Sequence, residues 1–166
     1  EVIAVEAGGG VSTRHSGPYV DDDPHLDFSL THWAYNRGKK SVVLDIELEQ
    51  DREKFLRLIQ SADILFEDCQ PGYLESLGLS PLDLANTNPQ IIHASITPYG
   101  LTGPRSHWLG TDLTAAAGSS FLYASGDADR APLRIGVPHS FLHGAADAAA
   151  ASLVALQERN RSGMGQ

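Results

Sequence analysis

The sequence contains a single cysteine, Cys69, in 166 residues. One cysteine excludes an internal disulfide framework and favours a reducing compartment, so we expect a cytoplasmic protein. No apolar run approaches the ~18 residues of a membrane-spanning helix, and no signal peptide is visible. Basic residues are also scarce, with 12 Lys and Arg against 21 Asp and Glu, a net charge of −9. This balance argues against a nucleic-acid-binding domain, which is typically basic, but not against a local basic pocket.

The length suits one domain with its own hydrophobic core. The chain starts at Glu1 rather than at a methionine and ends at "RSGMGQ" without a clear stop. We therefore expect it to be part of a longer polypeptide. It has no internal repeat and no low-complexity tract.

Short apolar runs alternate along the chain with segments of helical spacing. The apolar runs predict strands within 1–7, 41–46, 62–68 and 90–100. Helical patterns predict helices at 51–62, 71–78, 80–89, 110–125 and 138–160, and residues 8–35 are predicted to form a long loop. Strands that are continuous apolar runs are typical of a parallel sheet covered on both faces. We therefore expect an α/β fold, an open and mainly parallel sheet with helices on both faces.

Ligands of open α/β folds bind beyond the carboxyl ends of the strands. Here those ends carry polar or glycine-containing segments at 6–8, 45–47, 67–69 and 97–100. The "GGG" at 8–10 follows a strand but does not lead into a helical pattern, so it is not a dinucleotide-binding loop. The "DDDP" at 21–24 predicts a solvated acidic turn rather than a metal site.

Three polar side chains share one face of the last predicted helix, at spacings of four: His139, His143 and Asp147. Two histidines at this spacing suit a metal ion, but no glutamate supplies the base of an H-E-x-x-H pattern. Ordinary positions on a helix face are therefore favoured. Ser140 adjoins His139, yet neighbours on a helix point apart, which argues against a Ser-His-Asp triad.

Two further features leave alternatives open. Cys69 follows a strand and precedes a helix, where a thiol can have a lowered pKa; a lone thiol is more often a small buried filler. The turn "NRGKK" groups Arg37, Lys39 and Lys40. It is either a solvated charged turn or a cationic patch for a phosphate-bearing ligand.

Taken together, six stretches occur in the order and spacing of one family. They are EVIAVE (1–6), NRGKKSVVLDI (36–46), the block 62–104, GTDLTAAAG (110–118), PLRIGVP (132–138) and ALQERNRSGMGQ (155–166). In this combination the chain resembles the family III CoA-transferases, also called the CaiB/BaiF family. The resemblance covers nearly all of the sequence.

The resemblance implies a CoA-binding α/β domain. Residues 1–166 would form a partial large domain, truncated at both ends, whose long last helix leads to a second domain. It also implies an interlocked homodimer that moves CoA from an acyl-CoA to a small carboxylic acid, with the CoA thioester as substrate and no permanently bound cofactor or metal. In the family an Asp carboxylate attacks the thioester, giving a mixed anhydride and then a CoA thioester of the enzyme.

The family's Asp is the third residue after the Val-Pro of "RIGVP", and this chain has Phe141 there. Phenylalanine has no lone pair and no proton to give, so no catalytic residue is predicted. Asp147 lies six residues on, about 9 Å along a helix and some 240° around it. We do not expect it to replace the missing carboxylate.

Other departures fall where the family contacts CoA. Asp68 and Cys69 replace a common Asn-Phe pair, Gln70 and Ser76 replace basic residues, and Thr111 replaces a tyrosine, whereas Arg37, Gly38, Lys39, Pro71, Gly72, Gly100, Gly103, Pro104 and Asp112 are retained. The predicted CoA-binding residues are Arg37, Lys39, Lys40, Asp68, Cys69 and Gln70. Further pocket candidates are Tyr99, Gly100, Asp112 and His139.

Four functions remain open. The first is a CoA-transferase domain. The second is a non-catalytic CoA-binding or structural domain paired, in tandem or as a heteromer, with an active copy. The third is a 2-methylacyl-CoA racemase-like enzyme, although that branch also needs the Asp. A metal hydrolase built on His139, His143 and Asp147 lacks a further ligand.

Overall fold

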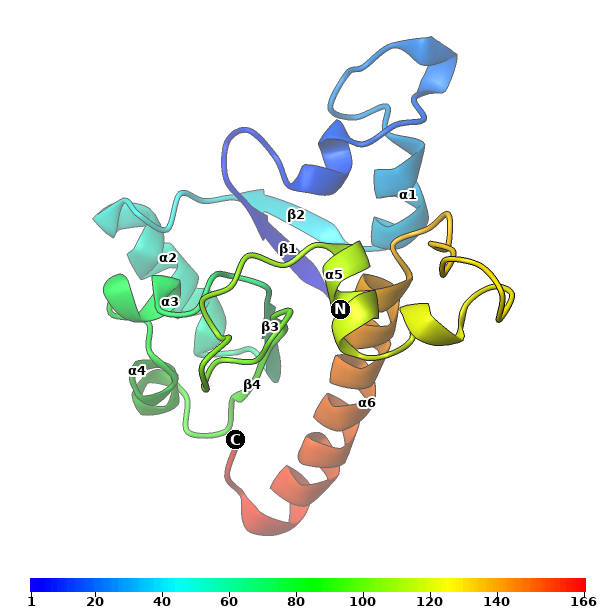
Figure 1. Cartoon of the computed structure of the whole chain (residues 1–166). Coiled ribbons are helices and arrows are strands. Elements are labelled where there is room, and N and C mark those ends of the chain that lie inside the picture. Colours follow the sequence, from blue (N-terminus) through cyan, green and yellow to red (C-terminus); the bar gives the residue numbers. More distant parts are fainter. The chain divides into compact units, whose positions relative to one another are not determined.

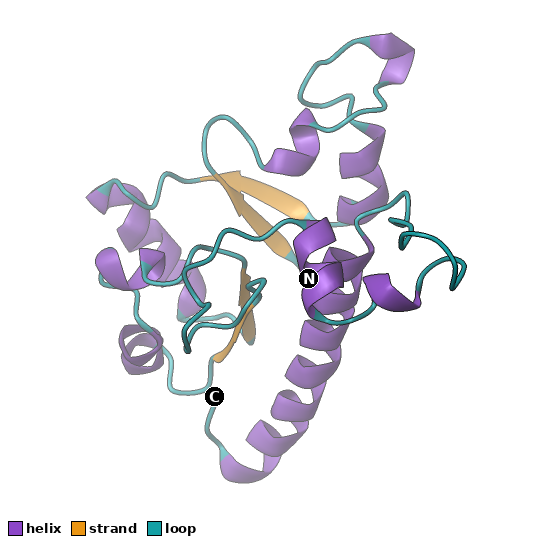
Figure 2. Cartoon of the chain, in the orientation of Figure 1, coloured by secondary structure: helices purple, strands orange, loops and turns teal.

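Two units make up the structure, a computed structural model that describes all 166 residues. They are Glu1–Leu58 and Ile59–Gln166. Figure 1 labels the helices and strands of both, and Figure 2 distinguishes helices, strands and loops.

The first unit is built on a parallel strand pair. β1 (Ile3–Glu6) pairs with β2 (Lys40–Val43), from Ile3 opposite Lys40 to Glu6 opposite Val43. Two short 3-10 helices, η1 (Ser12–His15) and η2 (Val20–Asp22), and α1 (Leu30–Asn36) lie between the strands in sequence. α2 (Glu49–Ile59) follows β2 and extends one residue into the second unit.

The long loop predicted at 8–35 is wrong in part, because η1, η2 and most of α1 fall within it. α1 has no strong apolar period; polar contacts hold its start instead. Ser29 is its N-cap and accepts a hydrogen bond from His32 N at 3.0 Å. The same hydroxyl is fully buried and lies 2.8 Å and 2.6 Å from the carbonyls of Thr13 and Ser16. The acidic turn is exposed, as predicted.

The second unit contains β3 (Ile64–Glu67) and β4 (Ile92–Ser95), again parallel. The short α3 (Tyr73–Ser76) and α4 (Pro81–Thr87) connect them. After β4 come α5 (Asp112–Gly118), η3 (Leu122–Ala124) and the long α6 (His139–Ser162), which contacts both α5 and β4.

The helix predicted at 110–125 is too long, because α5 ends at Gly118. Glycine weakens a helix, and Ser120 beyond it has a left-handed backbone with φ 65°. The predicted start of α4 is confirmed. Ser80 caps it with a reciprocal bond pair to Asp83, and Pro81 occupies the first turn.

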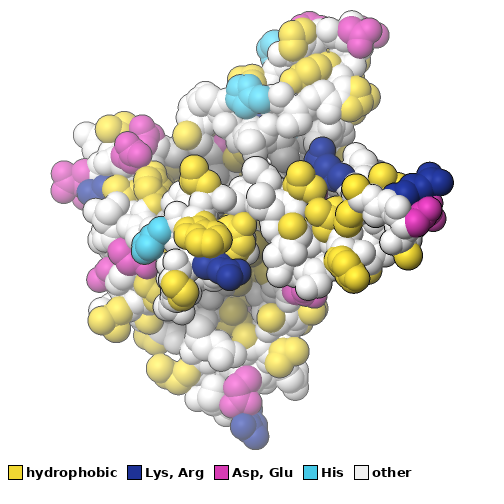
Figure 3. All heavy atoms as spheres, in the orientation of Figure 1, with side chains coloured by type: hydrophobic (Ala, Val, Ile, Leu, Met, Phe, Trp, Pro, Cys, Tyr) yellow, Lys and Arg dark blue, Asp and Glu magenta, His cyan; other side chains and the backbone are white.

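The α/β class with parallel strands is confirmed, but burial of the strands on both faces is not. The four strands form two two-stranded sheets. In this chain Val43 of β2 is 65% exposed and Phe66 of β3 is 47% exposed. Figure 3 shows hydrophobic side chains among the charged ones across the face drawn. In this chain, continuous apolar runs therefore indicate strands correctly, but they do not indicate that both faces of a strand are buried.

Buried apolar side chains are concentrated in the second unit. They are Ile59, Leu74, Leu79, Leu84, Ile91, Ile92, Ala116 and Ala155, whereas the first unit buries Leu44 and Phe55. None of the helices combines the length and the apolar composition that a membrane span requires.

The last residues lie directly against β4. Gly165 N donates to Pro89 O at 2.9 Å, and His93 N donates to Gln166 O at 2.9 Å. A side chain at Gly165 would collide with the carbonyl of Ile91. The second glycine of "GMGQ", Gly165, is thus required by close backbone approach.

Candidate functional site

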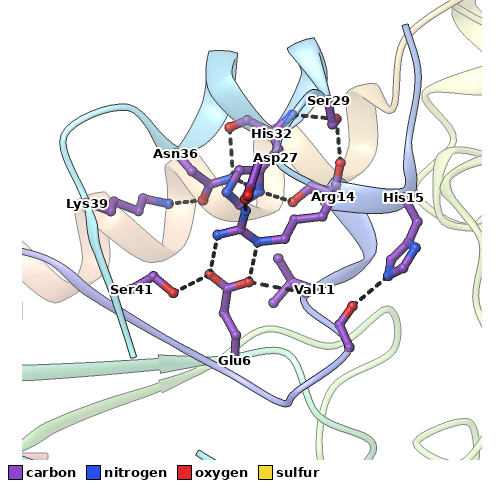
Figure 4. A network of polar contacts seen from close by, with 12 residues as sticks. Glu6, Val11, Arg14, His15, Asp27, Ser29, His32, Asn36, Lys39 and Ser41 are labelled. Atoms are coloured by element: carbon purple, nitrogen blue, oxygen red, sulfur yellow. Dashed lines mark hydrogen bonds and ion pairs between the residues drawn. The ribbon is translucent and has the colours of Figure 1, made fainter. Parts of the chain in front are cut away.

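A buried carboxylate organises the polar interior of the first unit. Glu6, the last residue of β1, is only 3% exposed. Its carboxylate pairs with Arg14 of η1 through Nε at 2.6 Å and Nη2 at 3.0 Å, and it accepts from Ser41 Oγ at 2.7 Å and Val11 N at 3.3 Å (Figure 4). Arg14 also reaches Asp27 at 3.0 Å. One carboxylate therefore ties η1 and its preceding loop to both strands.

The chemistry of this pair is that of a stable ion pair. The pKa of Glu6 is lowered to about 2, mainly by hydrogen bonds from Arg14. Burial opposes this effect, and hydrogen bonds from Ser41 and Val11 N add to it. The same pairing raises the pKa of Arg14. Both groups are charged at neutral pH. This network was missed from the sequence; an acidic residue closing an apolar strand was the available signal.

A second set of contacts runs from η1 through α1 to the basic turn. His32 Nδ1 lies 2.9 Å from Thr13 Oγ1 and 3.2 Å from Asn36 Nδ2. Asn36, the last residue of α1, accepts a hydrogen bond from Lys39 Nζ at 2.8 Å. Burial lowers the pKa of His32, and the charge on Arg14 adds to this effect. His32 is therefore neutral at pH 7.

The predicted basic turn lies between α1 and β2, with Gly38 at φ 80°. Its three cations are in different situations. Arg37 is exposed, Lys39 is exposed but held by Asn36, and Lys40 pairs with Glu1 at 2.8 Å. The turn is at the amino end of β2 rather than at the carboxyl end, where segment 45–47 follows.

In the second unit, Asp112 positions the start of α6. Asp112 is 8% exposed and follows Thr111, the N-cap of α5. Its Oδ1 accepts from Ser140 N at 2.8 Å and Phe141 N at 3.4 Å, and its carbonyl accepts from Ser140 Oγ at 3.2 Å. These N–H groups have no partner within their own helix, so a carboxylate stabilises them well.

The predicted pocket residue His139 lies in the same place. Its ring is 4.8 Å from that of Phe121 and 4.3 Å from that of His143, measured between centroids. The expected shared face of His139 and His143 is thus confirmed. A small hollow at His139 has Asp112, Phe121, Leu133, Arg134 and Ile135 among its other lining residues.

Phe141 lies in the first turn of α6, 48% exposed, with its N–H near the Asp112 carboxylate. A residue at this position is presented to solvent at a helix N-terminus, a place that suits an anionic side chain. Phenylalanine provides no group for covalent or acid–base chemistry there. No group of three or more His, Cys, Asp or Glu side chains in the chain is arranged to hold a metal ion.

The residues after β3 do not form a reactive thiol site. Burial raises the pKa of Cys69 to about 11, and the charges of Glu67 and Asp68 add to the rise. A raised pKa disfavours the thiolate at neutral pH, so it supports the alternative of Cys69 as a small, partly buried filler over a nucleophile. Asp68 and Gln70 are exposed beside it.

Glu67 forms a small polar cluster that the sequence did not indicate. Its carboxylate accepts from Cys69 N at 2.7 Å and lies 3.5 Å from His93 Nε2 on the neighbouring strand. His93 Nε2 is also 3.4 Å from Ser95 Oγ. The parallel register of β3 and β4 explains the proximity, since Leu65 is opposite His93 and Glu67 opposite Ser95.

Tyr99 and Gly100 lie in the loop after β4, in agreement with the expectation that segment 97–100 is at the carboxyl end of a strand. Gly100 has φ 80°, and the Tyr99 ring meets Trp108 edge-on at 6.0 Å. The Arg105 guanidinium lies 5.2 Å from the centre of the Trp108 ring. Within this unit, the structure brings Asp112 and His139 together, whereas Tyr99 contacts the aromatic side chain of its own loop.

Comparisons with known proteins agree on one family. The family model described as CoA-transferase family III matches residues 1–166. The chain is 40% identical to the succinyl-CoA:(R)-benzylsuccinate CoA-transferase subunit BbsE of Thauera aromatica, over 100% of this chain and 40% of that protein. It is 36% identical to the succinyl-CoA:glutarate CoA-transferase of Mus musculus, over 99% of this chain and 37% of that protein.

Solved structures give the same result. A CAIB/BAIF family protein from Brucella suis superimposes with a TM-score of 0.90 at 35% identity, covering 100% of this chain and 44% of that one. Rv3272 from Mycobacterium tuberculosis gives a TM-score of 0.84 at 36% identity, covering 100% and 46%. The chain thus spans about two fifths of the length of the curated relatives described above.

Proposed function

Because the chain belongs to CoA-transferase family III, we propose that it is a CoA-ester-binding domain of an enzyme that moves CoA from an acyl-CoA to a small carboxylic acid. The observation that carries this proposal is the family match over all 166 residues. The relatives from Thauera aromatica and Mus musculus are described as CoA-transferases that act with succinyl-CoA. A third relative, from Acetobacter aceti, is described as an acetyl-CoA:oxalate CoA-transferase. The substrate would be the CoA thioester, with no permanently bound cofactor.

We place the CoA contacts at the residues that the sequence indicated. Arg37 and Lys39 are exposed cations on a short turn and suit the phosphates of CoA. Lys40 is a weaker candidate, because Glu1 already pairs with it. Asp68, Cys69 and Gln70 would contact the neutral part of the ligand. Tyr99, Gly100, Asp112 and His139 remain candidates for the acyl side.

A second candidate function is a non-catalytic domain that works beside an active copy. Phe141 favours it, because the family's reaction needs a carboxylate at that position and phenylalanine cannot form an anhydride. The Thauera relative is described as a subunit, which is compatible with a hetero-oligomer. A homodimer belongs to the first proposal and a tandem or heteromeric partner to this one; a second domain after α6 and a cytoplasmic location are part of both.

Calorimetry with CoA on the whole natural protein tests the proposal. We expect binding, and we expect Arg37→Ala with Lys39→Ala to weaken it about tenfold, because two phosphate-facing charges are lost. The effect should be larger at low salt. Lys54→Ala is the matched control, since Lys54 pairs with Asp51 at 2.6 Å on α2. No CoA binding would contradict the proposed function; equal affinity in the double variant would remove the turn from the site.

A further inference from the structure

We infer that Asn36 and His32 are positioning residues that hold Lys39 in place for an anionic group of CoA. This inference rests on the proposed function, and it assigns a role to side chains that have no reactive chemistry of their own. The contacts form a series: Thr13 Oγ1 to His32 Nδ1 at 2.9 Å, Asn36 Nδ2 to His32 Nδ1 at 3.2 Å, and Lys39 Nζ to Asn36 Oδ1 at 2.8 Å (Figure 4).

The frame behind this series is fixed. α1 is capped by the buried Ser29, whose hydroxyl bonds back to the carbonyls of Thr13 and Ser16. Arg14, next to Thr13, is held by the buried Glu6. Asn36 Nδ2 makes a second contact of 3.2 Å, to His32 O one turn earlier on the helix. The amide of Asn36 therefore has a defined place at the end of α1.

Lys39 gains from this arrangement because its long side chain is otherwise free to rotate. An ammonium group has three donors, and Asn36 uses one of them. Two N–H groups remain for an anion. A cation that is already ordered loses less conformational entropy when the anion binds. Nearby Arg37 is exposed and adds positive charge to the same turn.

The protonation state of His32 decides which way the Asn36 amide faces. If Thr13 and Asn36 both donate to Nδ1, this nitrogen carries no proton. The amide nitrogen then faces His32 and the amide oxygen faces Lys39. A proton on Nδ1 would reverse this preference and turn the amide nitrogen toward the ammonium group. The charged groups acting on His32 are Arg14 and Lys39, which disfavour its protonation, and Glu6 and Asp27, which favour it.

The first test is CoA binding by calorimetry in the whole protein. We expect Asn36→Ala and His32→Leu each to weaken CoA binding about three- to tenfold, with pantetheine, which lacks the phosphates, unaffected. His32→Asn should restore most of the affinity, because an asparagine side chain places an acceptor near the position of Nδ1. Asn36→Ala combined with Lys39→Ala should bind CoA no more weakly than Lys39→Ala alone.

The second test compares the pH dependence of CoA binding in the unaltered protein and in His32→Asn. We expect the affinity of the unaltered protein for CoA to fall as the pH is lowered below 6.5, and to fall more steeply than in His32→Asn. The phosphates of CoA also titrate in this range, but they affect its binding to both proteins equally, so the comparison removes their contribution. Equal pH dependence in the two proteins would overturn the inference.

The outcomes separate the inference from the proposed function. Weaker CoA binding in Lys39→Ala, but unchanged binding in Asn36→Ala and His32→Leu, would overturn the positioning role and leave the proposed function intact. Absence of CoA binding in the unaltered protein would overturn both. Equal losses of affinity for CoA and pantetheine in Asn36→Ala would indicate a merely structural effect and would also overturn the inference.

Discussion

At the scale of single residues, two buried carboxylates have different tasks. Glu6 neutralises Arg14 and connects elements of the first unit. Asp112 accepts from two N–H groups at the start of α6 and so fixes the first turn that carries Phe141. The sequence indicated both positions, Glu6 as the end of a strand and Asp112 as a pocket candidate. It did not indicate their partners, because those come from segments that are distant in the sequence.

Glu6→Gln should change the acid stability of the protein. The pKa of Glu6 falls from an ordinary value of 4.5 to about 2 on folding. Its contribution is therefore complete above pH 4.5 and is lost as the pH falls through 2; it amounts to about 3 kcal/mol. Urea unfolding between pH 7 and pH 2 should show a flatter pH dependence in the variant.

The control for this experiment is Asp27→Asn, which removes the exposed partner of Arg14. Asp27 is 71% exposed, and an exposed ion pair contributes only about 0.2–1 kcal/mol. If Glu6→Gln and Asp27→Asn gave the same pH profile as the unaltered protein, the buried pair would not control acid stability.

Phe141→Asp tests whether the nucleophile is all that is missing. We expect at most about a tenfold gain in CoA transfer, because a carboxylate accelerates the reaction only when the thioester is held against it. Asp68, Gln70 and Thr111 also depart from the family pattern that the sequence resembles. The measurement is the rate of transfer between acyl-CoA and acid in the whole protein. Robust transfer by this single variant would mean that the rest of the site is intact.

At the scale of elements, the sequence predicted those helices whose starts carry a local signal, such as a capping residue or a proline. α4 begins at Ser80 and Pro81 as the sequence indicates, and α6 starts one residue after Pro138. α1 was missed because its stability comes from Ser29, His32 and the interior of the first unit rather than from apolar spacing. Boundaries set by tertiary polar contacts leave little trace in a single sequence.

Two leucines of α4 provide a matched pair for core packing. Leu84 is fully buried, whereas Leu82 is 70% exposed on the same helix. Leu84→Ala should lower the free energy of unfolding by about 2–5 kcal/mol, and Leu82→Ala by less than about 0.5 kcal/mol. Urea unfolding measures both. Similar losses in the two variants would contradict the arrangement of α4 in the second unit.

At the scale of the whole molecule, the sequence predicted the class of the fold and the family. Parallel strands joined through helices follow from the alternation of patterns, and the family follows from the order of its motifs, which the comparisons confirm. The sequence did not predict the exposure of strand residues such as Val43 and Phe66. An apolar run indicates a strand, but its exposure depends on which other segments cover it.

The binding roles of the site residues stay predictions, and the structure shows only where these residues lie. Asp112 and His139 do meet at the start of α6. The elevated pKa of the Cys69 thiol, which results mainly from burial, disfavours a role for Cys69 as a nucleophile. The hydrogen bonds that hold Lys39 could not be predicted, because they depend on Asn36 and His32 of α1, a helix that the sequence did not indicate. Sequence motifs therefore identify the family, whereas the packing of the chain decides which side chains are exposed and can contact a ligand.

The most direct test of the central claim is mass spectrometry of the whole natural protein, together with any homologous copy that copurifies with it, after incubation with acyl-CoA. Peptide mapping would identify the chain that carries a covalent CoA thioester. The account predicts that no carboxylate of residues 1–166 becomes modified and that an adduct forms on an Asp of a homologous copy. A CoA adduct on Asp147 or on any other carboxylate of this chain would contradict it.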